Sequence, residues 1–215
     1  MRTRSLSFAA LLFLACAGQK PAADKPPTAS SAPALSTEER TAAIDEMEKS
    51  RKAFLAAIDG LSDAQYRFKP APDRWSVAEV AEHIAVSEEM LLGMVKERVL
   101  KTPATPELLA QVNRDNNLLL SRVQDRSNKV QAPEMLRPSG RFPTVDAVKA
   151  AFGQSRDKSI EFVKAAPENL HAYAAPHPVL KALDGYQWLL LMSAHCTRHT
   201  AQIAEVKADP KFPRT

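Results

Sequence analysis

The residues best suited to chemistry are two histidines near the C-terminus. His195 and His199 lie four residues apart in the stretch LLLMSAHCTRHTAQIAEV, which is otherwise apolar and helical in its spacing. Side chains at positions i and i+4 lie on one face of a helix, about one turn apart. The two imidazoles can therefore bind one ion, and a third imidazole would complete a site that leaves a fourth position open.

His83 is the best candidate for the third ligand. It lies in the middle of a predicted helix, on the face that carries Val80 and Ser87, where a helix bundle would bury it. Metal sites are often built in bundle cores from side chains on facing helices. The alternative is that His83 is a hydrogen-bonded core residue. A three-histidine site would take a divalent ion such as Zn, Ni, Fe or Mn. The sequence does not identify the metal, because imidazole suits Zn, Ni, Cu and Fe alike.

The neighbours of the histidine pair suggest supporting roles. Cys196 follows His195, so the pair lacks the helix-borne Glu of the H-E-x-x-H motif, and Cys196 is expected to be a packed thiol. Gln202, three residues after His199, could orient a ligand or a bound water. It could equally bond the neighbouring helix.

Three other polar residues are weaker candidates. Glu79 lies one turn before His83 and could accept its ring N–H, but it also occupies the N3 position of a capping box. His177, between two prolines, is expected to shape the entry to the last helix. His171 has no functional case. Trp75 is expected to be a core anchor, with the lining of a pocket as the alternative.

The elements that must position these residues read as four long helices. Capping boxes begin the first two at Ser36 and Ser76, and Asp184 caps the last. Between the helices we expect a loop at 61–74, a mixed segment at 101–141 with a shorter helix over 106–123, and a loop at 171–183. The pattern predicts an all-α, antiparallel four-helix bundle, with helices over 37–58, 76–100, 144–166 and 185–207.

The N-terminus has the composition of an export leader. Two arginines precede a short apolar stretch in MRTRSLSFAALLFLACAGQ, which indicates a signal peptide over 1–17. Cys16 would be lipidated if the chain is a lipoprotein, and the alternative is simple cleavage after Ala17. Residues 18–36 are rich in Pro, Ala and Ser and predict a disordered tether to a folded domain at 37–213. We expect an exported envelope lipoprotein, otherwise a secreted protein.

Composition argues against other classes of function. The formal net charge is +4, and basic residues alternate with acidic ones rather than clustering. We therefore expect no nucleic-acid partner, and membrane contact only through an N-terminal lipid anchor. Two cysteines, Cys16 and Cys196, leave no disulfide framework if the first is acylated.

Two stretches resemble the signatures of the DinB-like family, also described as DinB/YfiT-like. Residues 75–84, WSVAEVAEHI, are similar to its W-S-x-x-E-x-x-x-H-I signature, and residues 195–203 are similar to its H-x3-H-x2-Q-I ending. Other stretches look like the DinB_2 branch, and the likeness extends over about Glu38 to Pro213. The resemblance implies a metal-binding four-helix bundle with His83, His195 and His199 as ligands.

The same resemblance implies several functions. Some relatives look like thiol S-transferases, others look like metal-dependent hydrolases, and many have no assigned chemistry. For this chain we expect a small-molecule substrate or ligand. A low-molecular-weight thiol would be scarce outside the cytoplasm, which favours water as the nucleophile. The alternatives are a non-catalytic envelope protein that binds a metal or small ligand, and a purely structural bundle with a vestigial site. We also allow for a homodimer.

Overall fold

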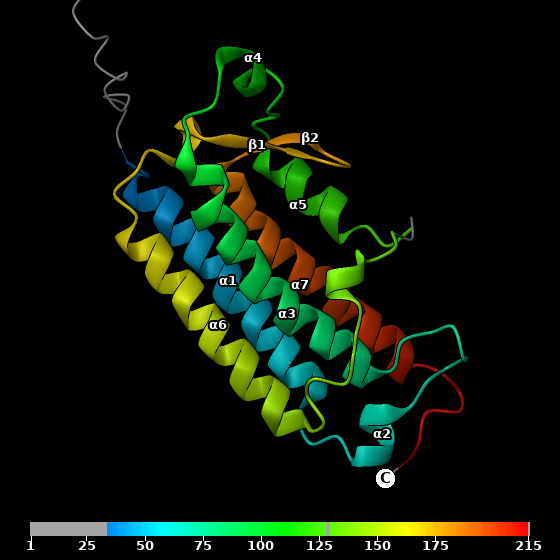
Figure 1. The fold of residues 1–215 in the computed structure, drawn as a ribbon. Helices are drawn as coiled ribbons and strands as arrows, with labels where there is room; N and C mark the ends of the chain where they lie inside the picture. The colour runs from blue at the N-terminus through cyan, green and yellow to red at the C-terminus, as the bar shows by residue number, and fades with distance from the viewer. Residues whose placement is uncertain (1–33, 128–129, 215) are drawn as a thin grey trace, which may run out of the picture.

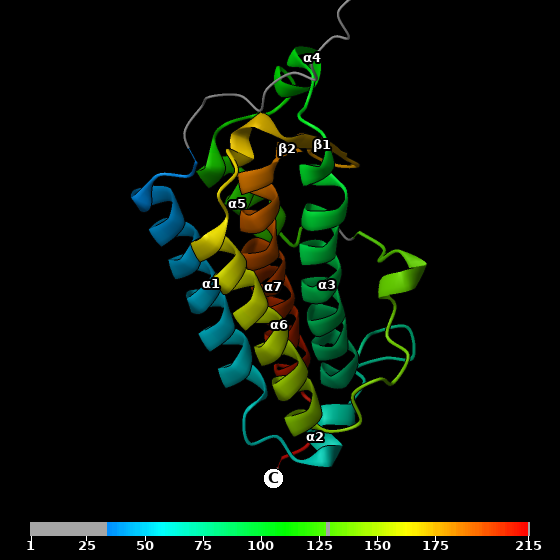
Figure 2. The ribbon, with the colours of Figure 1, turned by 60° about the vertical axis from the view of Figure 1, so that its left-hand side comes forward.

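The computed structural model describes residues 34–127 and 130–214, and four long helices dominate it (Figures 1 and 2). The predicted leader, most of the tether, and Cys16 lie outside these residues. The mostly helical fold expected from the sequence is confirmed. The long helices lie side by side around a common core. Their bounds are α1 Thr37–Ile58, α3 Val77–Glu97, α6 Val145–Ala165 and α7 Gly185–Lys207.

Side-chain caps begin three of the long helices where the sequence indicated. Ser36 and Ser76 both form the predicted capping boxes, with Glu39 and Glu79 respectively. The Asp184 carboxylate accepts the N–H of Gln187 and so caps α7. Such caps stabilise a helix by about 1 kcal/mol each, which explains why these boundaries could be predicted.

Hydrogen bonds at the helix ends establish how α1 lies against its neighbours. The Tyr186 hydroxyl, at the start of α7, donates to the Glu39 carbonyl at 3.1 Å. Lys207, at the end of α7, donates to the Ala57 carbonyl at 2.8 Å, so α1 and α7 run parallel. Arg40, at the start of α1, donates to the Ala166 carbonyl just past α6 at 2.6 Å, so α1 and α6 run antiparallel.

The bundle therefore differs from the fully antiparallel arrangement that we expected. α3 runs antiparallel to α7, whereas α3 and α6 run in the same direction, as the colour gradient in Figure 1 shows. The cause is the segment between them, which returns along the length of the bundle before α6 begins. A long crossover of this kind lets consecutive helices lie parallel. Two of the four neighbouring pairs are consequently parallel.

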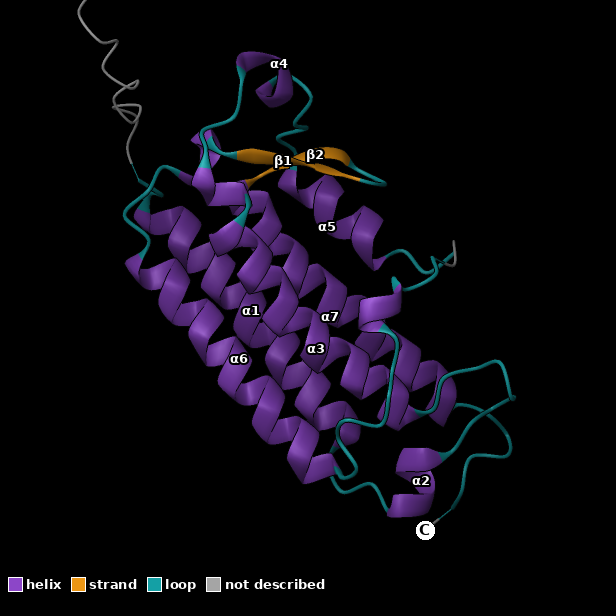
Figure 3. Cartoon of the chain, in the orientation of Figure 1, coloured by secondary structure: helices purple, strands orange, loops and turns teal. Residues whose placement is uncertain are grey.

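The crossover and the loop before α3 contain short helices (Figure 3). The crossover carries η1 Val99–Lys101, α4 Pro106–Leu109, α5 Asn116–Gln124 and η2 Glu134–Leu136. The single helix expected over 106–123 is thus divided, because Asp115 caps a new helix within it. Residues 61–74 hold α2 Asp63–Arg67, which Ser62 and Gln65 begin with another capping box.

A β-hairpin replaces the loop predicted at 171–183. After η3 Leu170–Ala172, strand β1 Ala174–His177 pairs antiparallel with β2 Lys181–Asp184, with Ala174 opposite Asp184 and His177 opposite Lys181. Lys181 takes a positive φ of 64° at the turn. Pro176 and the absence of an apolar alternation hid this hairpin from the pattern. The hairpin lies across the end of the bundle where α7 begins (Figure 3).

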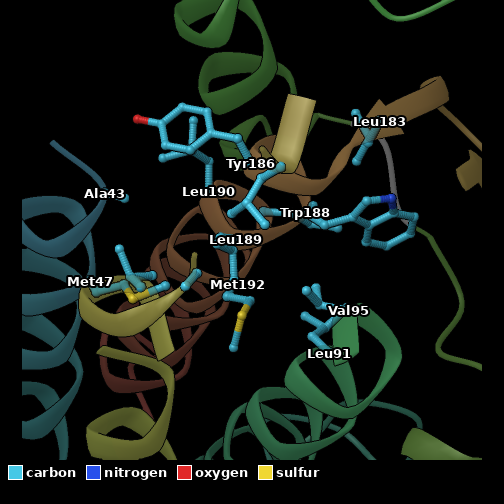
Figure 4. Close-up of a cluster of buried hydrophobic side chains, with 14 of the residues drawn as sticks. Ala43, Met47, Leu91, Val95, Leu183, Tyr186, Trp188, Leu189, Leu190 and Met192 are labelled. Carbon is cyan, nitrogen blue, oxygen red and sulfur yellow. The ribbon is translucent and has the colours of Figure 1, made fainter. Parts of the chain in front are cut away.

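Two apolar clusters fill the bundle. The first lies toward the hairpin and includes Met47 of α1, Leu91 of α3, and Leu189 and Met192 of α7 (Figure 4). The second lies toward α2 and includes Phe54 and Phe152, whose rings meet edge to face at 4.7 Å between centroids. No helix within 34–127 and 130–214 has both the length and the apolar character needed to cross a bilayer.

A buried ion pair fixes the helices to one another in the middle of the bundle. Arg156 of α6 donates to the Glu88 carboxylate of α3 at 2.8 Å, and both side chains are at most 2% exposed. The guanidinium also donates to the Met47 carbonyl and the Ser50 hydroxyl of α1. Ser159 donates to the other Glu88 oxygen at 2.8 Å. Removing one partner would leave an uncompensated buried charge, so this network holds α1, α3 and α6 in register.

Candidate metal centre

The three histidines selected from the sequence meet between α3 and α7. Each offers a ring nitrogen, and these nitrogens all lie within 4.8 Å of one another. The Nε2 atoms of His83 and His195 are 3.2 Å apart. The ring centroid of His199 lies 4.4 Å from the centroid of His83 and 4.4 Å from that of His195. This is the one such group of His, Cys, Asp or Glu in the described ranges of the chain.

The helices bring these residues together by simple geometry. His195 and His199 share a face of α7 because they are one turn apart. His83 lies in the first half of α3, which runs antiparallel to α7, and its ring meets those of His195 and His199 near the middle of α7. His83 is 3% exposed, whereas His195 and His199 are only partly buried. Of the three side chains, His83 exposes the least surface to solvent.

A backbone carbonyl fixes the ring of His83. The Leu136 carbonyl, in η2, lies 2.9 Å from His83 Nδ1. A carbonyl only accepts hydrogen bonds, so Nδ1 must carry the proton and the lone pair lies on Nε2. The Trp75 ring packs against the imidazole with 5.0 Å between centroids. His83 is thus presented with a free Nε2 pointed at the other two histidines.

Gln202 performs the same task for His199. Its side-chain oxygen lies 2.8 Å from His199 Nδ1, which leaves the His199 Nε2 free. Arg126, just after α5, donates to the same oxygen at 3.3 Å and makes a two-point ion pair with Glu205 at 2.6 and 2.8 Å. Gln202 therefore combines the two roles considered for it, since it orients a histidine and also bonds a neighbouring segment.

Burial keeps all three imidazoles neutral. It lowers the pKa of His83, and the bond to the Leu136 carbonyl opposes this only partly. It lowers the pKa of His195 well below the usual value, with His199 and His83 adding to the effect. Burial, and then the proximity of His83, lowers the pKa of His199 to about 3. Neutral imidazoles have the free lone pair that a metal ligand needs.

The donors fit a transition-metal ion. Two neutral Nε2 atoms that face each other at 3.2 Å can share a cation, and three such nitrogens are the ligand set of several zinc sites. Cys196 lies outside the set, because its thiol contacts the Ser50 carbonyl of α1 at 3.6 Å. Burial raises the pKa of the Cys196 thiol to about 12. It is the packed thiol that the sequence predicted.

The other sequence candidates lie away from the centre. Glu79 bonds the Ser76 N–H and Lys69, so the idea that it accepts the ring N–H of His83 is wrong. His177 accepts two N–H groups of the hairpin turn and packs on Trp188. His171 bonds Glu39 and Asp184 at the opposite end of α7 from Lys207.

Sequence reasoning missed three groups that contact the site or its supports. The Leu136 carbonyl could not be found, because a backbone oxygen leaves no trace in the choice of side chain. Arg126 belongs to a segment that we could not place relative to α7. Glu82 binds the turn that follows Leu136. It was missed because it lies beside the apolar face of α3 and not on it.

Comparison with known proteins identifies the family of the chain. A profile of the DinB superfamily matches residues 46–203, a range that contains all three histidines. A Bacillus subtilis (strain 168) protein with the name uncharacterized protein YuaE is 29% identical over 150 residues, which cover 70% of this chain and 88% of that protein. No solved structure matches the chain significantly.

Proposed function

This chain belongs to the DinB superfamily, and from that premise we propose that it binds one divalent metal ion through His83, His195 and His199. The observation that carries the proposal is the convergence of three neutral imidazoles from two helices. The acceptors on the Nδ1 atoms of His83 and His199 leave both Nε2 atoms available. Such outer partners are a regular feature of histidine metal sites.

We further propose that the centre acts on a small molecule. A divalent ion with three neutral ligands keeps its full charge, and so would supply the Lewis acidity that lowers the pKa of a bound water or thiol. The chain would contribute orientation through the Leu136 carbonyl and the Gln202 side chain, which hold the Nδ1 atoms of His83 and His199. Hydrolysis is our preferred reaction, with thiol transfer as the second, because we expect the chain to be exported.

One observation favours a non-catalytic binder as the alternative. Glu79 and Glu82 are the carboxylates closest to His83 in the sequence, and both are already engaged. Neither is free to act as a general base. A screen for ester hydrolysis and thiol conjugation with added Zn, Ni, Mn or Fe separates the two functions. Turnover lost in His195→Ala supports an enzyme, and rates equal to buffer support the binder.

Metal content tests the centre itself. We expect untagged protein to retain about one equivalent of a divalent ion by elemental mass spectrometry, and His195→Ala to retain almost none. His177→Ala is the matched control, because it removes a histidine that lies on the hairpin. Equal metal in wild type and His195→Ala would refute the assignment.

Export and lipidation are a separate proposal that rests on the leader sequence. The apolar stretch before Cys16 and the Pro-rich segment after it are typical of a tethered lipoprotein. We expect a fatty-acid probe to label the chain in cells, and Cys16→Ser to abolish the label. Label that persists in Cys16→Ser would rule out this attachment site, and secretion without label would favour cleavage after Ala17.

A further inference from the structure

Glu82 is a buried carboxylate immediately before the histidine of α3. Its side chain is 4% exposed, yet it accepts its hydrogen bonds from a turn rather than from a Lys or Arg side chain. Oε1 accepts from the Ser139 N–H at 2.7 Å and its hydroxyl at 3.1 Å. Oε2 accepts from the N–H groups of Gly140 at 2.9 Å and Arg141 at 3.0 Å. A buried carboxylate with this many donors is well satisfied.

The turn that Glu82 holds is built to meet it. Gly140 has a positive φ of 83°, a conformation that glycine adopts without strain. This conformation directs successive backbone N–H groups toward one carboxylate, as in the anion-binding arrangements of main-chain amides. The turn begins three residues after Leu136, whose carbonyl bonds His83. Two adjacent residues of α3 thus bind the same short segment at both of its ends.

We propose that Glu82 is a positioning residue for His83, acting through the 136–141 segment. Its carboxylate anchors the turn, the anchored turn places the Leu136 carbonyl, and the carbonyl selects the tautomer with the proton on Nδ1. Without that acceptor, the remaining polar contact of His83, between its Nε2 and His195 Nε2 at 3.2 Å, lets either ring carry the proton, and a proton on His83 Nε2 would block the ligand atom. The consequence for metal affinity rests on the proposed function, whereas the consequence for the tautomer does not.

The matched pair of variants is Glu82→Gln and Glu79→Gln. Glutamine at position 82 keeps the size of the side chain but turns one acceptor into a donor, which would face the N–H groups of the turn and displace it. Glutamine at position 79 keeps a capping box intact, and Glu79 bonds Ser76 and Lys69 instead of the turn. Both changes remove one negative charge from α3. A difference between the two variants therefore measures the effect of the contact with the turn and not the effect of the charge.

The primary readout is the tautomer of His83 in metal-free, EDTA-treated protein, from nitrogen-15 spectra of histidine-labelled chain. We expect wild type and Glu79→Gln to show a single Nδ1–H form of His83. We expect Glu82→Gln to show a substantial Nε2–H population, with the circular dichroism of the fold unchanged. An identical His83 spectrum in Glu82→Gln and wild type would overturn the proposal.

Zinc titration is the second readout. We expect Glu82→Gln to weaken Zn²⁺ binding about 10- to 100-fold, the usual cost of losing an outer-shell partner, and Glu79→Gln to leave it unchanged. Wild type that binds no Zn²⁺ would defeat the proposed function, while the tautomer experiment would still decide the role of Glu82. Equal Zn²⁺ affinity in Glu82→Gln and wild type would overturn the link to metal binding.

Gly140→Ala keeps the proposal testable if Glu82→Gln fails to fold. A Cβ at Gly140 has no atom within 4 Å, so the substitution acts only through the positive φ. It strains the turn without touching α3. We expect a change of the His83 tautomer in the same direction as in Glu82→Gln, but smaller. An unaltered tautomer in a Gly140→Ala variant whose 139–141 amides exchange faster would refute the coupling.

Discussion

The bundle holds histidines in two contrasting environments, and the difference lies in what faces each ring. His83, His195 and His199 face one another, a backbone carbonyl and a side-chain amide. His171 lies near the start of α7 between two carboxylates, with Nδ1 at 2.8 Å from Asp184 and Nε2 at 2.9 Å from Glu39. Both environments are partly or fully buried, yet they favour opposite protonation states of the imidazole.

The two environments move the histidine pKa in opposite directions. The hydrogen bond to Asp184 is the main cause that raises the pKa of His171, and Glu39 adds to it against the effect of burial. Burial without a carboxylate partner lowers the pKa of all three clustered histidines. The comparison teaches that a carboxylate partner decides whether a buried histidine is stabilised as a cation or as the neutral ring.

The largest expected effect is on the metal-free cluster at acid pH. The pKa of His199 is near 3 in the folded chain and about 6.5 when unfolded. Below that unfolded value the unfolded chain gains protons that the folded one does not, so stability falls by about 1.4 kcal/mol per pH unit. His199→Asn removes the group. We measure the free energy of unfolding in urea, with EDTA present. We expect the difference between this variant and wild type to favour the variant by about 2 kcal/mol more at pH 5 than at pH 8.

The control for that measurement is His177→Ala, which removes a histidine outside the cluster. Its own pKa is lowered by burial alone, so we expect a smaller pH dependence of the same sign. The difference in stability between His199→Asn and wild type could instead stay constant from pH 8 to pH 5. That result would contradict the claim that His199 stays neutral in the folded chain.

The next effect concerns the acceptor of His199. Gln202→Leu removes the oxygen that bonds Nδ1 at 2.8 Å, and we expect Zn²⁺ affinity to fall about tenfold. Gln202→Glu keeps an acceptor at the same place, and we expect it to retain affinity. Calorimetric titration of metal-free protein measures both. If Gln202→Leu binds as tightly as wild type, the amide serves only to hold Arg126.

The smallest expected effect is on the stability contributed by His171 and its two carboxylate partners. The raised pKa of His171 means that its ion pairs stabilise the fold fully below the unfolded pKa and are lost as pH rises through the folded pKa. His171→Asn should cost about 1 kcal/mol at pH 5.5, a modest value because the site is partly exposed. The cost should shrink toward pH 9. Denaturation at the two pH values tests this prediction. A cost that grows with pH would contradict the assignment of a positive charge to His171.

Local patterns predicted the parts of this fold that local energies control. The capping residues Ser36, Ser76 and Asp184 marked the starts of α1, α3 and α7, because unsatisfied N–H groups need acceptors near each helix start. The spacing of His195 and His199 placed both on one face for the same local reason. Choosing His83 needed an argument about burial, and the family resemblance strengthened it.

The tertiary structure decided which distant segments meet. The sequence by itself determined a helical chain with a histidine pair on its last helix and a third histidine on an inward face. Only packing decided that α3 and α6 run parallel, that a hairpin covers the end of the bundle, and that the Leu136 carbonyl reaches His83. The reason is physical: capping and periodicity act over a few residues, whereas backbone acceptors and crossover paths depend on contacts between residues that are far apart in the chain.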